Sequence, residues 1–154
     1  AIRFIYLTGF RRGDAVTVRW DAIQSEAIKI RTAKSKGRTA QEVTINAALQ
    51  GLLDATPRRA VTILSAGSGK PYTPNAITHA LTDRLAIIRK THPDFATGKR
   101  LHDMRGSRAS QEVAAMLNDP AIRRRMGWSE GKTDAPGSYV NTVTTLEIAR
   151  KARK

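Results

Sequence analysis

Two short runs of alternating apolar and polar residues limit the possible folds of this chain more than any other feature. The first run, residues 27–32, places Ile28 and Ile30 on one face, and the second run places Val43 and Ile45 on one face. A period of two residues predicts strands that are buried on one side. The connection between the runs is polar and contains glycine, so we predict a β-hairpin with a basic tip.

The remaining patterns are mostly helical. Residues 1–12 contain the end of a helix, and Pro74 opens a long helix whose Ile77, Leu81, Leu85 and Ile88 share one face. We also predict a third strand over residues 61–64. Further helices are predicted over residues 14–18, 46–54, 101–117 and 120–126. The expected fold class is therefore α+β and mainly α, with a small antiparallel sheet.

Length and charge narrow the possible functions. The chain has 154 residues, and 27 Lys and Arg against 13 Asp and Glu give a net charge of +14. Arginine supplies 18 of these cations, and its planar guanidinium group suits phosphate. We expect one domain, a fragment of a longer protein because the chain opens inside a helix, with a nucleic acid as the main partner.

Several classes of protein are excluded. Without cysteine the chain forms no disulfide, no thiolate nucleophile and no cysteine-based zinc site. No apolar run approaches the length that spans a bilayer, so we expect a soluble, cytoplasmic protein without a membrane partner. His102 and Arg105 lie one helical turn apart and share a face. An isolated pair of this kind is more often part of a solvated helix surface, so the two residues alone identify no reaction.

The surrounding motifs give the pair a context. The segment LTGFRRGDAVTVRWDAI precedes a basic hairpin, then LHDMRGSRAS, and finally Tyr139 in GSYVNT. This order resembles the catalytic domain of the tyrosine recombinases, also called phage-type integrases, over nearly the whole chain. The matching positions are Thr8, Gly9 and Arg11 in the first arginine motif, Asp14, Trp20 and Asp21 after it, Lys34 on the hairpin, His102, Arg105, Trp128 and Tyr139. Trp128 stands where most members of the family have histidine.

The resemblance implies site-specific DNA recombination through a covalent 3′-phosphotyrosine link, with no cofactor and no metal. Arg11 and Arg105 would hold the nonbridging phosphate oxygens, with Trp128 as a third donor. Tyr139 would be the nucleophile and His102 would assist it, while protonation of the leaving 5′ oxygen falls to the hairpin cation, which is residue Lys34 in our assignment. Lys36, two residues further on, is the competing candidate for this role, and Lys34 would then be one more solvated cation of the same tip.

The resemblance also implies partners and location. We expect double-stranded DNA with a specific recombination site and a tetramer on that DNA, in a bacterial or phage-encoded, nucleoid-associated setting. The family usually adds an amino-terminal core-binding domain, and residues 142–154 would form a carboxy-terminal tail. The cations expected to contact DNA beyond the scissile phosphate are Arg12, Lys36, Arg38 and Arg108, together with the arginines at 123–125.

Two other functions remain open. A noncatalytic module that binds double-stranded DNA would use the same basic surface, and it would bind in a salt-sensitive way without any covalent species. A type IB topoisomerase would share the tyrosine and the two arginines, but it would relax supercoiled DNA without a specific site.

Overall fold

The computed structural model describes residues 1–114 and 119–128, and within them it has the predicted α+β architecture. The helices are α1 (Ile2–Thr8), α2 (Arg12–Thr17), α3 (Ala47–Asp54), α4 (Pro74–Arg89), α5 (Asp103–Ala114) and α6 (Asp119–Met126). The strands are β1 (Ile23–Gln24), β2 (Ala27–Arg31) and β3 (Ala40–Thr44), and two single 3₁₀ turns are η1 (Trp20–Ala22) and η2 (Ala33–Ser35). None of the described helices is long and apolar enough to cross a membrane.

The predicted hairpin is confirmed. Strands β2 and β3 pair antiparallel from Ala27 opposite Thr44 to Arg31 opposite Ala40. Ile28 and Val43 face each other across the strands and are buried, as the alternation predicts. The hairpin tip contains η2, so Lys34 lies on a structured turn.

The prediction of a strand over residues 61–64 is wrong. Val61 is 60% exposed whereas Ile63 and Leu64 are both buried, and only an isolated bridge joins this segment to Arg19. The third strand of the sheet is β1, which pairs with β2 in the order β1-β2-β3. With two residues, β1 is too short to show an alternating pattern in the sequence.

One apolar core joins α1, α2 and α3 to the hairpin. Its fully buried members include Phe4, Phe10, Ile28, Leu49 and Ile63. The rings of Phe4 and Phe10 lie 6.0 Å apart on either side of the turn that ends α1. This core therefore anchors the segment that carries the first arginine motif.

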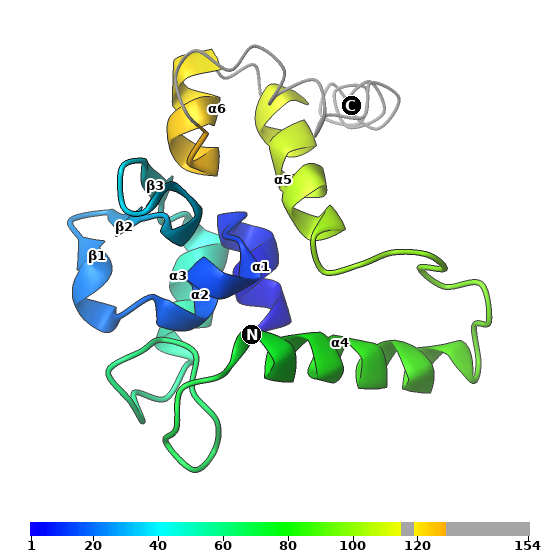
Figure 1. Ribbon diagram of the computed structural model, residues 1–154. Coiled ribbons are helices and arrows are strands. Elements are labelled where there is room, and N and C mark those ends of the chain that lie inside the picture. The colour runs from blue at the N-terminus through cyan, green and yellow to red at the C-terminus, as the bar shows by residue number, and fades with distance from the viewer. Residues whose placement is uncertain (115–118, 129–154) are drawn as a thin grey trace.

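Helix α4 begins as predicted, with the Thr73 side chain capping it and Pro74 in its first turn. Ile77 is fully buried, but Ile87 and Ile88 are 55% and 38% exposed. Figure 1 shows why the predicted apolar face holds only for the first half: α4 extends away from α1–α3, and its last turns lie outside the described core.

Helices α5 and α6 lie on the side of the molecule opposite α4 in Figure 1, with α6 next to the hairpin and α5 next to α1. Helix α1 packs on α5, and α6 packs on β3. Gly106 does not interrupt α5, and Gly127 ends α6 in the left-handed conformation at φ 59°. The structure therefore brings the first and last described segments together around the hairpin.

Candidate active site

The first arginine motif is shaped by the end of α1. The Thr8 hydroxyl donates to the Phe4 carbonyl and accepts from the Phe10 amide, and Gly9 adopts φ 65°. A Cβ on Gly9 would lie 3.2 Å from Arg108 and 3.3 Å from Met126, so this turn is in close contact with α5 and α6. The tight turn buries Phe10 and leaves Arg11 at the start of α2.

Arg105 links this turn to the end of α6. Its side chain is 1% exposed, and its guanidinium donates from Nη1 to the Gly9 carbonyl and from Nη2 to the Met126 carbonyl. A planar fork can bind two fixed acceptors at once, which an ammonium group does less well. Arg105 therefore sits in a defined orientation between segments that are far apart in the sequence.

Asp14 connects Arg11 to the hairpin. The buried Asp14 carboxylate accepts the Ala33 amide at 2.9 Å through Oδ1, while Oδ2 lies 3.8 Å from Arg11 Nη1. Arg11 Nη1 is buried and has no hydrogen-bond partner among the described residues. Asp14 thus places a guanidinium donor beside the hairpin residue that precedes Lys34.

The hairpin tip carries three of the predicted cations. Lys34, Lys36 and Arg38 are all exposed, and Lys36 adopts a positive φ of 51° next to Gly37. Of these three, only Lys34 contributes to the electrostatic environment of His102. The charge of Lys34 therefore acts on His102, and the assignment of Lys34 rather than Lys36 to the hairpin position of the motif stays a prediction.

His102 lies where the charged groups meet. Partial burial lowers the pKa of its imidazole, and the positive charge of Arg105 lowers it further. Asp103 raises this pKa to a smaller extent, and Arg11 and Lys34 lower it again. An imidazole with a lowered pKa is neutral at pH 7 and can accept a proton.

Trp128 is buried next to Arg105. Its ring lies 6.0 Å from the Arg105 guanidinium carbon, its exposure is 6%, and its amide donates to the Arg123 carbonyl at 2.9 Å. A Cβ on Gly127 would lie 2.9 Å from Thr32 and 3.1 Å from Gln41, so the residue before Trp128 fits closely against the hairpin. The structure therefore brings Trp128 together with Arg105, as the motif order implies.

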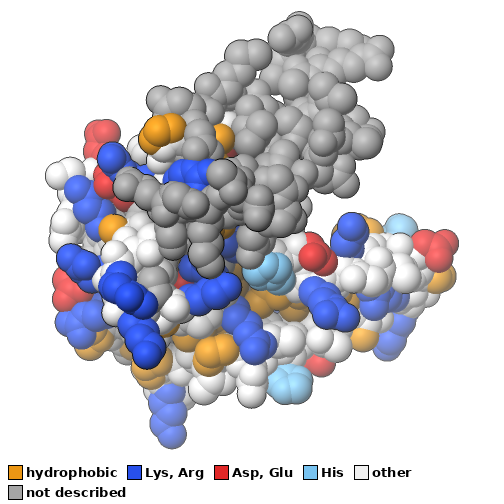
Figure 2. All heavy atoms as spheres, turned by 45° about the horizontal axis from the view of Figure 1, so that its top comes forward, with side chains coloured by type: hydrophobic (Ala, Val, Ile, Leu, Met, Phe, Trp, Pro, Cys, Tyr) orange, Lys and Arg blue, Asp and Glu red, His pale blue; other side chains and the backbone are white. Residues whose placement is uncertain are grey.

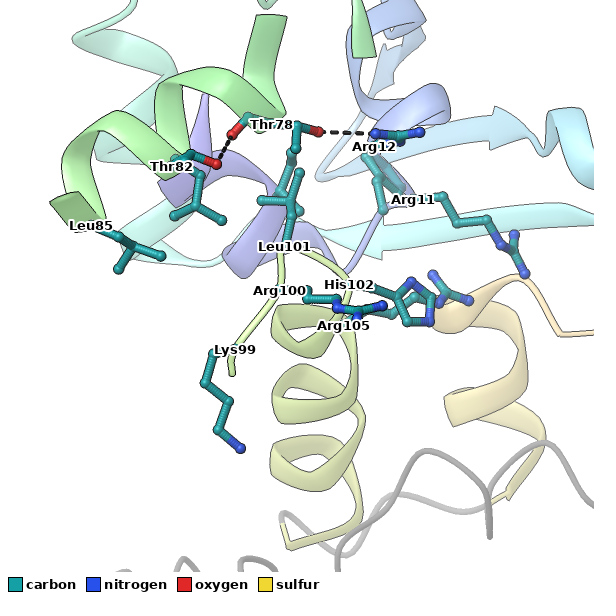
Figure 3. Close-up of a pocket in the computed structure, with 13 residues that line it drawn as sticks. Arg11, Arg12, Thr78, Thr82, Leu85, Lys99, Arg100, Leu101, His102 and Arg105 are labelled. Carbon is teal, nitrogen blue, oxygen red and sulfur yellow. Dashed lines mark hydrogen bonds between the residues drawn. The ribbon is translucent and has the colours of Figure 1, made fainter. Parts of the chain in front are cut away.

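A pocket of about 400 Å³ opens beside these groups. Figure 3 shows Arg11, His102 and Arg105 on one side of it and Thr82 and Leu85 of α4 on the other. Lys99 and Arg100 also line the pocket, and the motifs do not identify them. Their position directly before the HxxR motif is the only signal in the sequence that could have indicated them.

The cations predicted to bind DNA are in different environments. Arg12 donates to the Thr78 hydroxyl of α4 at 2.9 Å, and Arg108 pairs with the buried carboxylate of Glu112. Arg38 is exposed on the hairpin. Lys and Arg side chains are spread over the described part of the face in Figure 2. DNA contact by these residues stays a prediction.

Tyr139, the predicted nucleophile, and the predicted tail over 142–154 lie outside the described residues. Within residues 1–114 and 119–128, no group of three His, Asp or Glu side chains is arranged to hold a metal ion. Trp20 and Asp21 of the first motif lie apart from the pocket lining: the Arg58 guanidinium stacks 4.6 Å from the Trp20 ring, and Asp21 pairs with Arg19 at 2.7 Å.

Solved structures share this fold. The Tn1549 transposon integrase, in complex with circular intermediate DNA, matches 99% of this chain and 56% of its own at a TM-score of 0.71 and 15% identity. The lambda integrase tetramer bound to a Holliday junction matches 91% of this chain and 41% of its own, at a TM-score of 0.68 and 16% identity. XerA recombinase matches 97% of this chain and 56% of its own, at a TM-score of 0.67 and 14% identity.

A scan against protein-family models and a search of curated proteins give no match. The likeness therefore lies in the fold, which is that of a tyrosine recombinase catalytic domain. The chain spans about half the length of the solved chains that it matches.

Proposed function

We propose that this chain cleaves and rejoins DNA strands at specific sites through a covalent link between Tyr139 and a 3′ phosphate. One observation carries the proposal: Arg11, His102 and Arg105, from separate segments of the chain, line one pocket together with Arg12, Lys99 and Arg100. Arg11 follows α1, Lys34 lies on the hairpin tip and Arg105 lies on α5, and all three act on the pKa of His102. A cleft lined by positive charge raises the local concentration of anions such as phosphate.

The arrangement suits a phosphodiester in its transition state. Attack on phosphorus increases the negative charge on the nonbridging oxygens, and donors held in place before the reaction stabilise that charge. Arg105 is oriented by two carbonyls, and Arg11 presents a buried Nη1 near Asp14. We assign both guanidinium groups and the Trp128 indole to the nonbridging oxygens.

The proposed step forms one bond and breaks one. The Tyr139 oxygen attacks phosphorus, the bond from phosphorus to the 5′ oxygen breaks, and neutral His102 takes the phenolic proton. Lys34 donates a proton to the departing 5′ oxygen, which leaves as a hydroxyl. The phosphotyrosine ester keeps the energy of the broken bond, so the reverse step rejoins a strand.

The DNA complexes of the similar integrases support a DNA partner for this chain. We propose that it acts on double-stranded DNA with a specific recombination site and forms a tetramer there. The net charge of +14 supports attraction to the DNA backbone. We place the reaction on cytoplasmic, nucleoid-associated DNA of a bacterium or its phage.

A covalent capture experiment tests the proposal. The chain is incubated with a pool of nicked DNA duplexes of randomised sequence, and adducts that survive SDS are isolated and sequenced. The nick lets the released fragment, which carries the new 5′ hydroxyl, diffuse away, so the covalent adduct accumulates. We expect an adduct with an enriched DNA sequence, and we expect Tyr139→Phe to abolish it.

Tyr72→Phe is the matched control, because Tyr72 packs on the core and lies outside the pocket lining. It should retain the adduct. Salt-sensitive binding without any adduct would support a noncatalytic DNA-binding module instead. An adduct without sequence enrichment, accompanied by relaxation of supercoiled DNA, would support a type IB topoisomerase.

A further inference from the structure

Glu112 in the last turn of α5 is a buried carboxylate that the proposed reaction does not use. Its side chain is 4% exposed, Arg108 of the same helix contacts Oε1, and Arg125 Nη1 of α6 lies 2.7 Å from Oε2. Acidic side chains are rarely buried this deeply unless they are paired. Two guanidinium groups from two helices therefore meet on one carboxylate.

Arg125 makes two further contacts that reach the hairpin. Its Nη2 donates to the Thr44 hydroxyl at 3.3 Å, and its carbonyl accepts from Gln41 Nε2 at 2.5 Å. Gln41 is fully buried in β3. The last turn of α6 is thus bound both to α5, through Glu112, and to the sheet.

The residues that follow Arg125 belong to the site. The Met126 carbonyl accepts from Arg105, Gly127 fits against Thr32 and Gln41, and Trp128 packs next to the Arg105 guanidinium. A displacement of the last turn of α6 would therefore move the Trp128 indole. It would also move one of the two carbonyls that orient Arg105.

We propose that Glu112 and Arg125 form a positioning pair for DNA cleavage: their ion pair holds the end of α6 against α5 and β3 and thereby sets the positions of Trp128 and Arg105. The inference rests on the proposed function, because it assigns the pair to the cleavage step. The inference also gives Arg125 a different role from the neighbouring Arg124. Arg124 is exposed, whereas the Arg125 guanidinium contacts Glu112 and Thr44, so we assign Arg125 no phosphate.

Arg125→Met is the primary test, because Glu112 keeps its partner Arg108 in this variant. The chain has two tryptophans, so a Trp20→Phe background makes Trp128 the only fluorophore of this kind. In that background we expect blue-shifted, poorly quenched emission from the buried indole. Arg125→Met should shift the emission to the red and make acrylamide quenching more efficient, without any DNA present.

Lys29→Met is the matched control. It removes a cation from an exposed ion pair with Glu42 on the same hairpin, and it should leave the emission unchanged. An emission spectrum of Arg125→Met that equals that of its parent, in a protein with native circular dichroism, would overturn the proposal. If Arg125→Met fails to fold, Arg125→Lys keeps a cation near Glu112 but loses the fork, and it should give an intermediate red shift.

Cleavage and binding are then measured separately on a DNA captured by the covalent selection. At saturating protein, Arg125→Met should slow single-turnover adduct formation by about 10–100-fold, since small displacements at a reacting centre have effects of this size. Its Kd and the salt dependence of binding should not change. A weaker Kd with a smaller salt slope and an unchanged adduct rate would instead make Arg125 a phosphate contact.

The two proposals fail in different ways. If the unsubstituted chain forms no adduct, the proposed function fails, and the fluorescence measurement still decides whether Arg125 positions Trp128. If the chain forms an adduct and neither the emission nor the adduct rate responds to Arg125→Met or Arg125→Lys, the positioning pair is disproved while the proposed function stands.

Discussion

The two sides of the candidate site are held in place by different forces. On the α5–α6 side, which consists of α5, α6 and the hairpin, directed polar contacts join every element: Arg105 to two carbonyls, Glu112 to two arginines and Gln41 to the Arg125 carbonyl. On the α4 side, Ile77 is the one fully buried residue of the helix within the described part of the chain, and there a single side-chain hydrogen bond, from Arg12 to Thr78, joins α4 to α2.

The difference follows from what each side must do. Hydrogen bonds and ion pairs are directional, so they fix the orientation of the cationic groups as well as their position. Apolar contact is not directional and sets only the approximate placement of a helix. Substitutions on the α5–α6 side should therefore disturb catalytic geometry, whereas substitutions on the α4 side should change stability or the shape of the pocket.

The largest effect is expected for Arg105→Ala. It removes the donor from two carbonyls, and each unsatisfied buried acceptor costs about 1–3 kcal/mol, so the free energy of unfolding should fall by about 2–6 kcal/mol. Adduct formation should be lost as well. Urea denaturation measures the stability, with Arg84→Ala on the exposed surface of α4 as the control. Loss of the adduct at unchanged stability would show that the carbonyl contacts do not hold the turn after α1 and the end of α6 together.

The next largest loss of stability is expected in the first turns of α4. Ile77→Ala truncates a fully buried side chain and should cost about 2–4 kcal/mol, as large-to-small core substitutions do. Ile88→Ala, at a position that is 38% exposed, should cost about 1 kcal/mol or less. Thermal and urea denaturation compare the two variants. Equal losses of stability in the two variants would mean that the last turns of α4 are packed as firmly as its first turns.

Gly127→Ala should have a smaller but specific effect on the α5–α6 side. A left-handed conformation costs a residue with a Cβ about 1–2 kcal/mol, and at Gly127 that Cβ would also lie 2.9 Å from Thr32. Gly37→Ala is the matched control, because φ is 78° there and no atom lies within 4 Å of the added Cβ. The difference between the two losses of stability isolates the close fit against the hairpin, and no difference would contradict it.

The smallest effect is expected in the titration of His102. Because the folded pKa lies below the ordinary 6.5, the unfolded chain binds the proton more readily. The stability from this group is complete above pH 6.5 and is lost as the pH falls toward the folded pKa. Arg11→Gln removes one positive charge and should raise the pKa toward 6.5, which NMR of the imidazole measures. A pKa that falls or stays constant would place Arg11 away from His102.

Local patterns predicted much of this fold. The hairpin came from alternation, the start of α4 from Pro74, and the range of α6 from residues 120–126, because each signal lies within a few neighbouring residues. Strand β1 has only two residues, so no alternating pattern predicted it. The second half of α4 was predicted to have a buried face, but periodicity shows only that a face is apolar and not whether another element covers it.

The site shows the same division. The residue types and their order determined which side chains are candidates, since TGFR, the hairpin lysine and HxxR can be read directly from the sequence. Only the tertiary structure decided what each charged group contacts: Arg105 holds two carbonyls, Arg108 and Arg125 share Glu112, and Asp14 accepts the Ala33 amide next to Lys34. The reason is physical, because a charge acts through the distance and burial of its partners, and the folded chain sets both.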